Sequence, residues 1–326
     1  MKPQIIQRQM MAVYAPFSML AGLQMELFTH LADDPKDAVS LAETLGVKVV
    51  KLRPVLYSLV NAELLEEKNG IFSNCPEADH FLVKGKPDYI GGMHELLSDL
   101  WHAALRTAES IRQGKPQAKH DYDAMTEEEL SAFFRGLHSH AKAAGRHLSE
   151  TYEFSRFHHL VDAGGGSGGS AIAACELCPN LRATVADLPS IIPYSKHFIE
   201  EAGMENRIDV IGVDLTQEPL SGRYDAALLR NFIQVLGPKA ANKALQNVGQ
   251  AMQPGGEIYI VGSVLDDDRR SPPEIVAFNI VFLNIYDEGE AYTESEYRAW
   301  LKDAGFGNFE RILLPLGYSL IRASMV

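Results

Sequence analysis

Short apolar runs separated by amphipathic segments fill the second half of the chain. The runs predict strands, and the segments between them have the spacing of helices. Regular alternation of strand and helix is typical of an α/β fold, with a mainly parallel sheet covered by helices on both faces. Strands are expected at residues 158–162, 182–186, 208–212, 224–229, 257–264 and 317–323.

The first part of the chain has a helical pattern followed by one hairpin. Residues 1–32 predict helices, and residues 40–46 predict a short helix capped by Ser40 and ended by Gly46. A second helix is expected at residues 47–61, and Asn69-Gly70 then joins two short strands at 64–67 and 71–73. Two helices followed by a hairpin form a winged-helix pattern.

An apolar stretch at residues 10–23 needs a separate interpretation. It is too short to span a bilayer, and Pro16 interrupts it. Its apolar character continues to Leu31 with polar residues interleaved, which suits a helix packed on protein, including another subunit. We therefore expect no membrane partner and a cytoplasmic location.

Residues 92–155 also have a helical pattern, with a break at 114–116. His138 and His140 are two residues apart, so they do not share a helix face and no paired metal site is expected. The chain then divides into a winged-helix-like domain at 1–100, connecting helices at 101–155 and an α/β domain at 156–326.

Composition limits the classes of partner. The net charge of −13 disfavours nucleic acid, because binding phosphates requires a basic face. The same charge balance argues against DNA binding by the winged-helix pattern. Cys75, Cys175 and Cys178 are too few for a disulfide framework, and the Cys175–Cys178 pair is expected to be two buried thiols on a helix.

A glycine-rich turn after the first expected strand is the strongest chemical signal. Asp162, Gly164, Gly166 and Gly168 stand at alternate positions, and Ser170 is placed to cap a helix over residues 171–177. Glycines allow a tight turn and close approach of a ligand to the backbone. The next strand ends in Asp187, where a carboxylate can accept hydrogen bonds from a ribose. The pattern predicts a nucleotide or nucleoside site.

Four motifs extend this signal. They are Asp162-Ala-Gly-Gly-Gly-Ser-Gly168, Val185-Ala-Asp-Leu-Pro189, Leu229-Arg-Asn231 and Gln253-Pro-Gly-Gly256. In this order the chain resembles the S-adenosylmethionine-dependent small-molecule O-methyltransferases of the caffeate, hydroxyindole and bacterial antibiotic type. The resemblance implies a Rossmann-like class I methyltransferase sheet, S-adenosylmethionine as cofactor, a small-molecule acceptor, and an N-terminal domain that forms a homodimer.

The resemblance also implies roles for residues at the expected sheet edge. The glycine turn would hold the amino-acid end of the cofactor, Asp187 its ribose, and the positions after the second and third strands its adenine. Arg230 falls at a position near the cofactor's edge that is usually basic. The implied cofactor-binding residues are Asp162, Gly164, Gly166, Gly168, Asp187, Leu188, Asp214, Leu215 and Arg230.

The chain departs from the family where the family has its catalytic base. Gln234 falls at the position of a histidine that deprotonates the acceptor hydroxyl, and an amide cannot act as a base near neutral pH. Two acidic positions of plant-type members fall at Ser263 and Ala291, although a slip of one residue would place Glu290 at the second. The usual acid–base residues are therefore missing.

This departure leads to one main hypothesis and two alternatives. The main one is a methyltransferase whose acceptor needs no strong base, such as sulfur, nitrogen or an acidic oxygen, with Gln234 orienting it. The alternatives are a non-methylating enzyme that uses the cofactor in hydroxylation, decarboxylation or pericyclic chemistry, and an inactive dimeric scaffold. The resemblance places these residues in the acceptor pocket: Phe133, Leu137, His138, Asn231, Asn279, Phe282, Leu283 and Tyr286.

Overall fold

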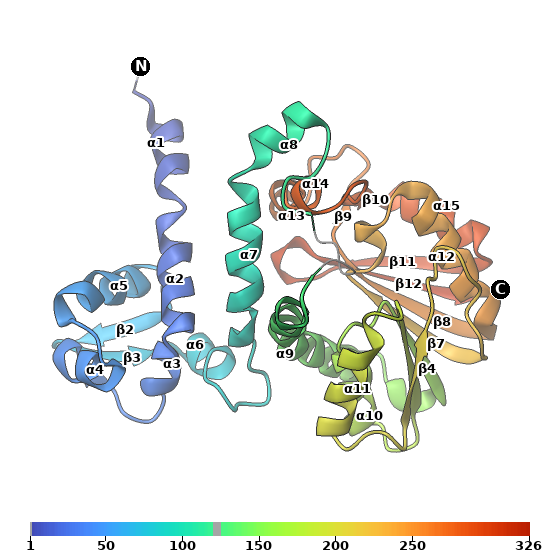
Figure 1. Ribbon diagram of the computed structural model, residues 1–326, viewed down its shortest axis with the longest axis horizontal. Helices are drawn as coiled ribbons and strands as arrows, with labels where there is room; N and C mark the ends of the chain where they lie inside the picture. Colours follow the sequence, from blue (N-terminus) through green and yellow to red (C-terminus); the bar gives the residue numbers. More distant parts are fainter. Residues whose placement is uncertain (1, 120–124) are drawn as a thin grey trace. The chain divides into compact units, whose positions relative to one another are not determined.

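The computed structural model describes residues 2–119 and 125–326 (Figure 1). Contacts divide the chain into two compact units, residues 1–98 and residues 99–326. Each unit is described by itself below. Among the described residues, no helix combines the length and the apolar character that crossing a membrane requires.

The first unit contains the expected helices and hairpin. Its core consists mainly of leucines, with Phe28, Phe72 and two alanines, and it draws on both the helices and the hairpin. The helical and hairpin predictions are confirmed. The elements are α1 (Gln4–Met11), α2 (Tyr14–Gln24), α3 (Leu27–His30), β1 (Lys36–Asp37), α4 (Ala38–Leu45), α5 (Val49–Asn61), β2 (Leu65–Lys68), β3 (Ile71–Asn74) and α6 (Pro76–Phe81).

The expected cap of α4 is wrong by three residues. Asp37, not Ser40, precedes the helix, and its Oδ1 accepts hydrogen bonds from the backbone N–H groups of Val39 (2.8 Å) and Ser40 (2.9 Å). A carboxylate at this position also interacts favourably with the positive end of the helix. The predicted end at Gly46 is confirmed, with a left-handed φ of +67°.

The second unit alternates helix and strand as expected, after three helices. Helix α7 (His94–Ala104) crosses the boundary between the units. The further elements are α8 (Thr107–Gln113), α9 (Glu127–Thr151), β4 (His159–Ala163), α10 (Gly169–Leu177), β5 (Arg182–Asp187), α11 (Ile192–Glu201), β6 (Ile208–Gly212), β7 (Tyr224–Arg230), α12 (Pro238–Ala251), β8 (Met252–Gly262), β9 (Val264–Leu265), α13 (Pro273–Phe278), α14 (Phe282–Ile285), β10 (Tyr292–Thr293), α15 (Glu294–Asp303), β11 (Phe306–Leu313) and β12 (Ser319–Met325).

One seven-stranded sheet organises this unit, in the order β11-β12-β8-β7-β4-β5-β6. The five strands from β8 to β6 are parallel, and β12 is antiparallel to both of its neighbours. A mainly parallel sheet is therefore confirmed. Strand β11 is absent from the expected strands because it is an edge strand, with a register shift between Gly307 and Glu310 and little apolar alternation.

Two hydrophobic cores lie on opposite faces of the sheet. Val161 and Ala163 of β4 pack in a core with α12 and α15, whereas Leu160 packs in a core with α9, α10 and α11. Figure 1 shows α12 and α15 together on one side of the sheet and α10 and α11 on the other. Since successive strand residues point to opposite faces, β4 contributes to both cores and is held between them.

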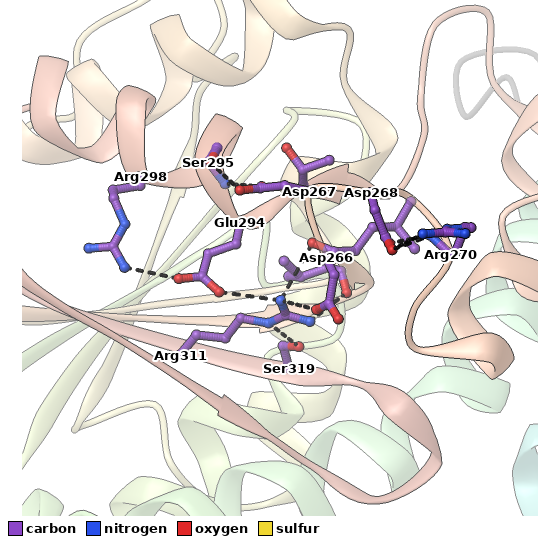
Figure 2. Close-up of polar contacts among 12 residues, drawn as sticks. Asp266, Asp267, Asp268, Arg270, Glu294, Ser295, Arg298, Arg311 and Ser319 are labelled. Atoms are coloured by element: carbon purple, nitrogen blue, oxygen red, sulfur yellow. Dashed lines mark hydrogen bonds and ion pairs between the residues drawn. The ribbon is translucent and has the colours of Figure 1, made fainter.

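A half-buried arginine fixes the segment between β9 and α15. The Arg311 guanidinium on β11 donates to Asp266 Oδ1 (2.8 Å), Glu294 Oε2 (3.3 Å) and the carbonyl of Val264 (3.0 Å), and its Nε donates to Ser319 Oγ (3.0 Å). Figure 2 shows these side chains gathered around the guanidinium. The arginine thereby anchors both ends of the segment that carries α13 and α14.

Candidate functional site

The carboxyl edge of the parallel strands brings the predicted polar residues together. Asp162 lies near the end of β4, Asp187 ends β5, Arg230 ends β7, and Asp214 follows β6 by two residues. Because β4 pairs with both β5 and β7, Asp162 lies between the other two strand ends. Ligands of parallel α/β sheets bind at this edge.

The turn between β4 and α10 is closely packed by neighbouring side chains. Gly164, Gly166 and Gly168 all have left-handed φ values, of +68°, +55° and +70°. A Cβ on Gly164 would lie 2.5 Å from the Phe232 ring, and one on Gly166 would lie 3.1 Å from the Phe134 ring. Only glycine satisfies both the backbone conformation and the available space.

The expected cap of α10 is also wrong. Gly168 precedes the helix, and Ser170 lies inside it with its hydroxyl donating to the carbonyl of Ala141 (3.1 Å). Asp162 Oδ2 instead accepts a hydrogen bond from the Ala171 N–H in the first turn, at 3.3 Å. Asp162, at the end of β4, therefore accepts a hydrogen bond from the start of α10. Ser170 links α10 to α9 by its own hydrogen bond.

Asp162 and Asp187 are carboxyl groups with raised pKa values. Burial raises the pKa of Asp162 to about 7, with the neighbouring Arg230 charge opposing that shift. Burial raises the pKa of Asp187 to about 6, although its Oδ2 accepts from the Gly166 N–H (2.7 Å) and its Oδ1 from the Leu188 N–H (2.8 Å). Both groups favour the neutral form more than a solvated aspartate does.

Asp214 and Leu215 follow β6 in a short turn. Asp214 Oδ1 accepts from the Thr216 backbone N–H (2.9 Å) and hydroxyl (2.7 Å). Leu215 is buried, and its carbonyl accepts from the Asn247 side chain at 2.9 Å. The turn is held on the sheet edge beside the end of β5, because Val213 N–H donates to the carbonyl of Asp187.

Gln234 is buried, and both ends of its amide are engaged. Its Oε1 accepts from the Ser263 backbone N–H (2.6 Å), and its Nε2 donates to Asn231 Oδ1 (3.3 Å). Asn231 has a left-handed φ of +54°, which turns the chain sharply after β7. The segment after Arg230 thus places a hydrogen-bonded amide at the position where the family resemblance implies a base.

Helix α9 presents two different faces to the site. His138 belongs to the face that meets the glycine turn: its Nδ1 lies 3.0 Å from Ser167 Oγ, and its ring stacks on Phe198 at 4.1 Å between centroids. Burial lowers the pKa of His138 to about 4, so the ring is neutral near pH 7. Phe133 and Leu137 are half-buried and lie on a different face.

Helices α13 and α14 hold the remaining predicted acceptor residues. Asn279 Oδ1 accepts from the Ala291 N–H at 2.7 Å, so this amide oxygen secures the loop after α14. Phe282 is buried and stacks with Tyr286 at 6.3 Å. Leu283 is half-buried. Of the two alternative acid positions, Ala291 is fully buried and Glu290 forms an ion pair with Arg269.

Comparison with known proteins agrees with this geometry. The sequence model of the O-methyltransferase domain matches residues 108–307. A 3-hydroxy-5-methyl-1-naphthoate 3-O-methyltransferase of Streptomyces sahachiroi is 31% identical over 293 residues, covering 88% of this chain and 85% of the relative. The chain belongs to the O-methyltransferase family. Members of this family take the methyl group from S-adenosylmethionine, so the protein is an S-adenosylmethionine-dependent methyltransferase.

Two further relatives extend the comparison. The N,N-dimethyltransferase OxyT of Streptomyces rimosus is 26% identical over 317 residues, covering 93% of this chain and 91% of the relative. The crystal structure of human N-acetylserotonin methyltransferase with S-adenosylmethionine superposes with a TM-score of 0.83 at 23% identity, covering 98% of this chain and 96% of that one. The second likeness shows that the fold is shared.

The residues of the sheet edge fit S-adenosylmethionine. The left-handed glycine turn has no side chains of its own at the carboxyl edge of β4, and Asp162 and Asp187 are acids suited to a cationic, hydroxyl-rich molecule. When bound, the cofactor supplies a methyl group on a positively charged sulfur. Sequence reasoning excluded a paired metal site at His138 and His140 without giving His140 a specific role, and it treated Ser263 only as a missing acid. The buried, unpartnered polar atoms of His140 and Ser263 become visible only in the fold.

Gly164→Ala should abolish most cofactor binding. The new Cβ would clash with Phe232 as well as occupy a left-handed conformation, so affinity for S-adenosylhomocysteine should fall by more than about tenfold. Gly203→Ala is the matched control, because Gly203 has a φ of +64° but no atom within 4 Å of the added Cβ. Calorimetry should show that the control binds like the parent. Equal binding by both variants would contradict the packing argument.

Cofactor affinity should depend on pH through Asp162 and Asp187. Because burial raises both pKa values, the free folded protein is most stable with the acids neutral, and that contribution is lost as pH rises through about 6 to 7. A cationic ligand and ribose hydroxyls favour the ionised acids, so S-adenosylmethionine should bind more weakly as pH falls through this window, by up to about tenfold per unit for each group.

Calorimetry in two buffers of different ionisation enthalpy would detect the accompanying proton release. Asp187→Asn is the control variant, since it should remove the part of the pH dependence that begins near pH 6. An affinity that stays constant from about pH 5.5 to about pH 8 would rule out this linkage.

Proposed function

We propose that this methyltransferase acts on a small-molecule acceptor that needs no strong general base: a sulfur, a nitrogen or an acidic oxygen. The observation that supports this is the engagement of the Gln234 amide by Ser263 and Asn231. An amide held in this way orients a neighbour but cannot take its proton. An acceptor that already offers a lone pair needs no residue to remove a proton before methyl transfer.

The cofactor would lie along the carboxyl edge of β4, β5 and β6. The turn at Gly164, Gly166 and Gly168 would hold its amino-acid end, and Asp162 would stand beneath that turn. Asp187 would accept from its ribose hydroxyls, which requires exchange of at least one of the backbone hydrogen bonds that this carboxylate now accepts. The residues proposed along its adenine and outer edge are Leu188, Asp214, Leu215 and Arg230.

The acceptor would lie between α9 and the pair α13–α14. Aromatic and aliphatic side chains supply shape, and amides supply orientation, as in most small-molecule pockets. The bound cofactor would supply the methyl group, and the pocket side chains would hold the lone pair of the acceptor atom toward it. The proposed pocket residues are Phe133, Leu137, His138, Asn231, Gln234, Asn279, Phe282, Leu283 and Tyr286.

The named activities of the relatives are compatible with this range of acceptors. The Streptomyces sahachiroi relative is named for transfer to an oxygen of a hydroxynaphthoate, and the Streptomyces rimosus relative for dimethylation of nitrogen. Both oxygen and nitrogen acceptors are therefore found among similar chains. Label transfer from methyl-labelled S-adenosylmethionine to a panel of amines, thiols, acidic phenols and weakly acidic phenols would test the proposal. Transfer confined to the weakly acidic phenols would overturn it.

Gln234→Ala should reduce turnover of any acceptor found in that screen by up to about a hundredfold, because the acceptor loses its orienting partner. Affinity for S-adenosylhomocysteine should change by less than about twofold, because the amide does not belong to the glycine turn. Gln234→Glu is the conservative control, since it keeps an oxygen for the Ser263 N–H. Unchanged turnover in Gln234→Ala would remove Gln234 from the mechanism.

We further propose that the first unit mediates dimerisation. Helix α1 buries none of its residues, even its apolar ones: Ile5, Ile6, Met10 and Met11 are each more than 60% exposed. Such an apolar helix surface is characteristic of an interaction site, and a second copy of the chain is the partner that the family resemblance implies. The winged-helix assignment of this unit stays a prediction.

Light scattering at micromolar concentration should give the mass of a dimer. Ile6→Ser combined with Met10→Ser should shift the protein toward the monomer, because the variant removes apolar area from the contact. Gln7→Ser is a matched control on the same helix and should leave the mass unchanged. A parent protein that is monomeric at this concentration would refute the assembly.

A further inference from the structure

Asn284 is a fully buried asparagine that links two segments of the second unit (Figure 1). Its Oδ1 accepts a hydrogen bond from Ser110 Oγ of α8 (2.8 Å), and its Nδ2 donates to Thr107 Oγ1 at the start of the same helix (2.9 Å). Its Nδ2 also donates to the carbonyl of Ile280 (2.9 Å), which lies between α13 and α14. One amide therefore joins α8 to the junction of α13 and α14.

The contacts around Asn284 permit one orientation of its amide. A carbonyl can only accept a hydrogen bond, so the amide atom beside the Ile280 carbonyl is the nitrogen. Thr107 Oγ1 donates its own proton to the carbonyl of Ala104 (2.7 Å) and accepts from the same nitrogen. The amide oxygen then faces Ser110, which supplies a hydroxyl proton. Both ends of the side chain are thus paired, as buried amides require.

Arg106 stabilises α8 as the support for this contact. Its guanidinium donates to Glu109 Oε2 within α8 (3.2 Å from Nε and 3.0 Å from Nη2). It also donates to the carbonyl and to the side-chain oxygen of Gln117, so the segment after α8 folds back on the start of the helix. The next residue, Ala118, donates its backbone N–H to the Asn284 carbonyl at 3.0 Å. The side chain and the main chain of Asn284 are therefore both held by α8 and the residues after it.

Helix α14 depends on external contacts of this kind, because it is a single turn of four residues. A helix of that length is not stable by itself in water. Phe282 and Tyr286 are four positions apart and stack on each other, whereas Asn284 lies two positions from each and points to α8. Phe282 and Tyr286 belong to the proposed acceptor pocket. The hydrogen bonds of Asn284 with α8 therefore fix the position of this aromatic pair.

We propose that Asn284 is a positioning residue of the acceptor pocket: its hydrogen bonds to α8 hold α14 in place and thereby set the size of the acceptor that fits. The inference rests on the proposed function, because that function assigns Phe282 and Tyr286 to the pocket. Asn284 acts through these two side chains and not by contact with the acceptor. Since protein interiors are close-packed, releasing α14 on its outer side lets the aromatic pair move outward. The pocket then contacts small acceptors less well and admits larger ones.

Ser110→Ala tests the proposal from outside the pocket. It removes one hydroxyl of α8 and leaves Asn284 Oδ1 buried without that donor. Asn284→Asp is the second variant, because it keeps the shape of the side chain and removes both donors of Nδ2. Ser149→Ala is the matched control, since Ser149 is another buried serine of this unit whose hydroxyl donates within its own helix, to the Gly145 carbonyl (2.7 Å).

The first measurement compares methyl transfer to thiophenol and to the larger 2-naphthalenethiol, two acceptors that need no strong base as thiolates. In Ser110→Ala and Asn284→Asp, KM for thiophenol should rise by at least about fivefold while kcat changes by less than about twofold, because a displaced side of the pocket removes contacts made equally in the ground and transition states. The ratio of kcat/KM for the larger thiol to that for the smaller should rise by at least about threefold. Ser149→Ala should keep KM and this ratio within about twofold of the parent.

The second measurement is hydrogen–deuterium exchange of the backbone, which requires no turnover. The amide protons of residues 284–286 should exchange at least about fivefold faster in Ser110→Ala than in the parent, because α14 has lost an external contact. Exchange in α10 should be unchanged. Affinity for S-adenosylhomocysteine should stay within about twofold of the parent, because Ser110 lies outside the glycine turn.

The outcomes separate this inference from the function on which it rests. Faster exchange in Ser110→Ala with unchanged KM and size ratio would leave Asn284 a structural role only and overturn the inference alone. Unchanged exchange of residues 284–286 would also overturn it, whatever the acceptor. A parent protein that methylates weakly acidic phenols and neither thiol would overturn the proposed function; phenol and 2-naphthol would then replace the thiols in the size comparison. If the parent methylates none of these probes, the exchange result decides whether α8 holds α14.

Discussion

The close approach between the β4–α10 turn and its neighbours is the constraint on which the ligand-binding edge depends. Phe232, Phe134 and Val185 occupy the space that side chains would take at Gly164, Gly166 and Gly168. The turn is therefore fixed from three directions: the segment after β7, helix α9 and strand β5. In the proposed function the same turn presents its backbone to the cofactor, so packing and binding would use the same atoms.

The sequence was sufficient for most of the sheet and for the edge at which the predicted polar residues meet. Apolar runs predicted six of the seven strands of the main sheet, and the spacing of Asp162 and Asp187 predicted which strand ends meet. The edge strand β11 escaped prediction because one neighbour and partial exposure leave little apolar alternation. Both helix caps were misplaced because only the backbone conformation fixes where a helix begins: α4 begins after an earlier polar residue, Asp37, and α10 follows Gly168, which has no side chain to act as a cap.

The direction of side chains on a helix was the other property that the sequence could not predict. His138 and His140 are equally plausible in the sequence, since each lies in the same amphipathic stretch. The fold stacks His138 on Phe198 beside the glycine turn, whereas a buried ring nitrogen of His140 has no hydrogen-bond partner among the residues that the structure describes. Similarly, Ser263 reads as the loss of an acid, whereas in the fold its backbone holds Gln234. Such distinctions depend on which neighbours a face meets, and that information is not local.

The hydrogen bonds of Arg311 give the two sides of the proposed acceptor pocket different tolerance to substitution. Helix α9 contacts the glycine turn. Replacing residues of α9 to admit a new acceptor would therefore also disturb the proposed binding of the cofactor. The segment from Asp266 to Glu294 is tied at both ends to one guanidinium, and its middle carries α13 and α14. Substitutions that change the substrate, in the family or in laboratory redesign, should therefore accumulate between Asp266 and Glu294. The proposed cofactor site would stay unaltered.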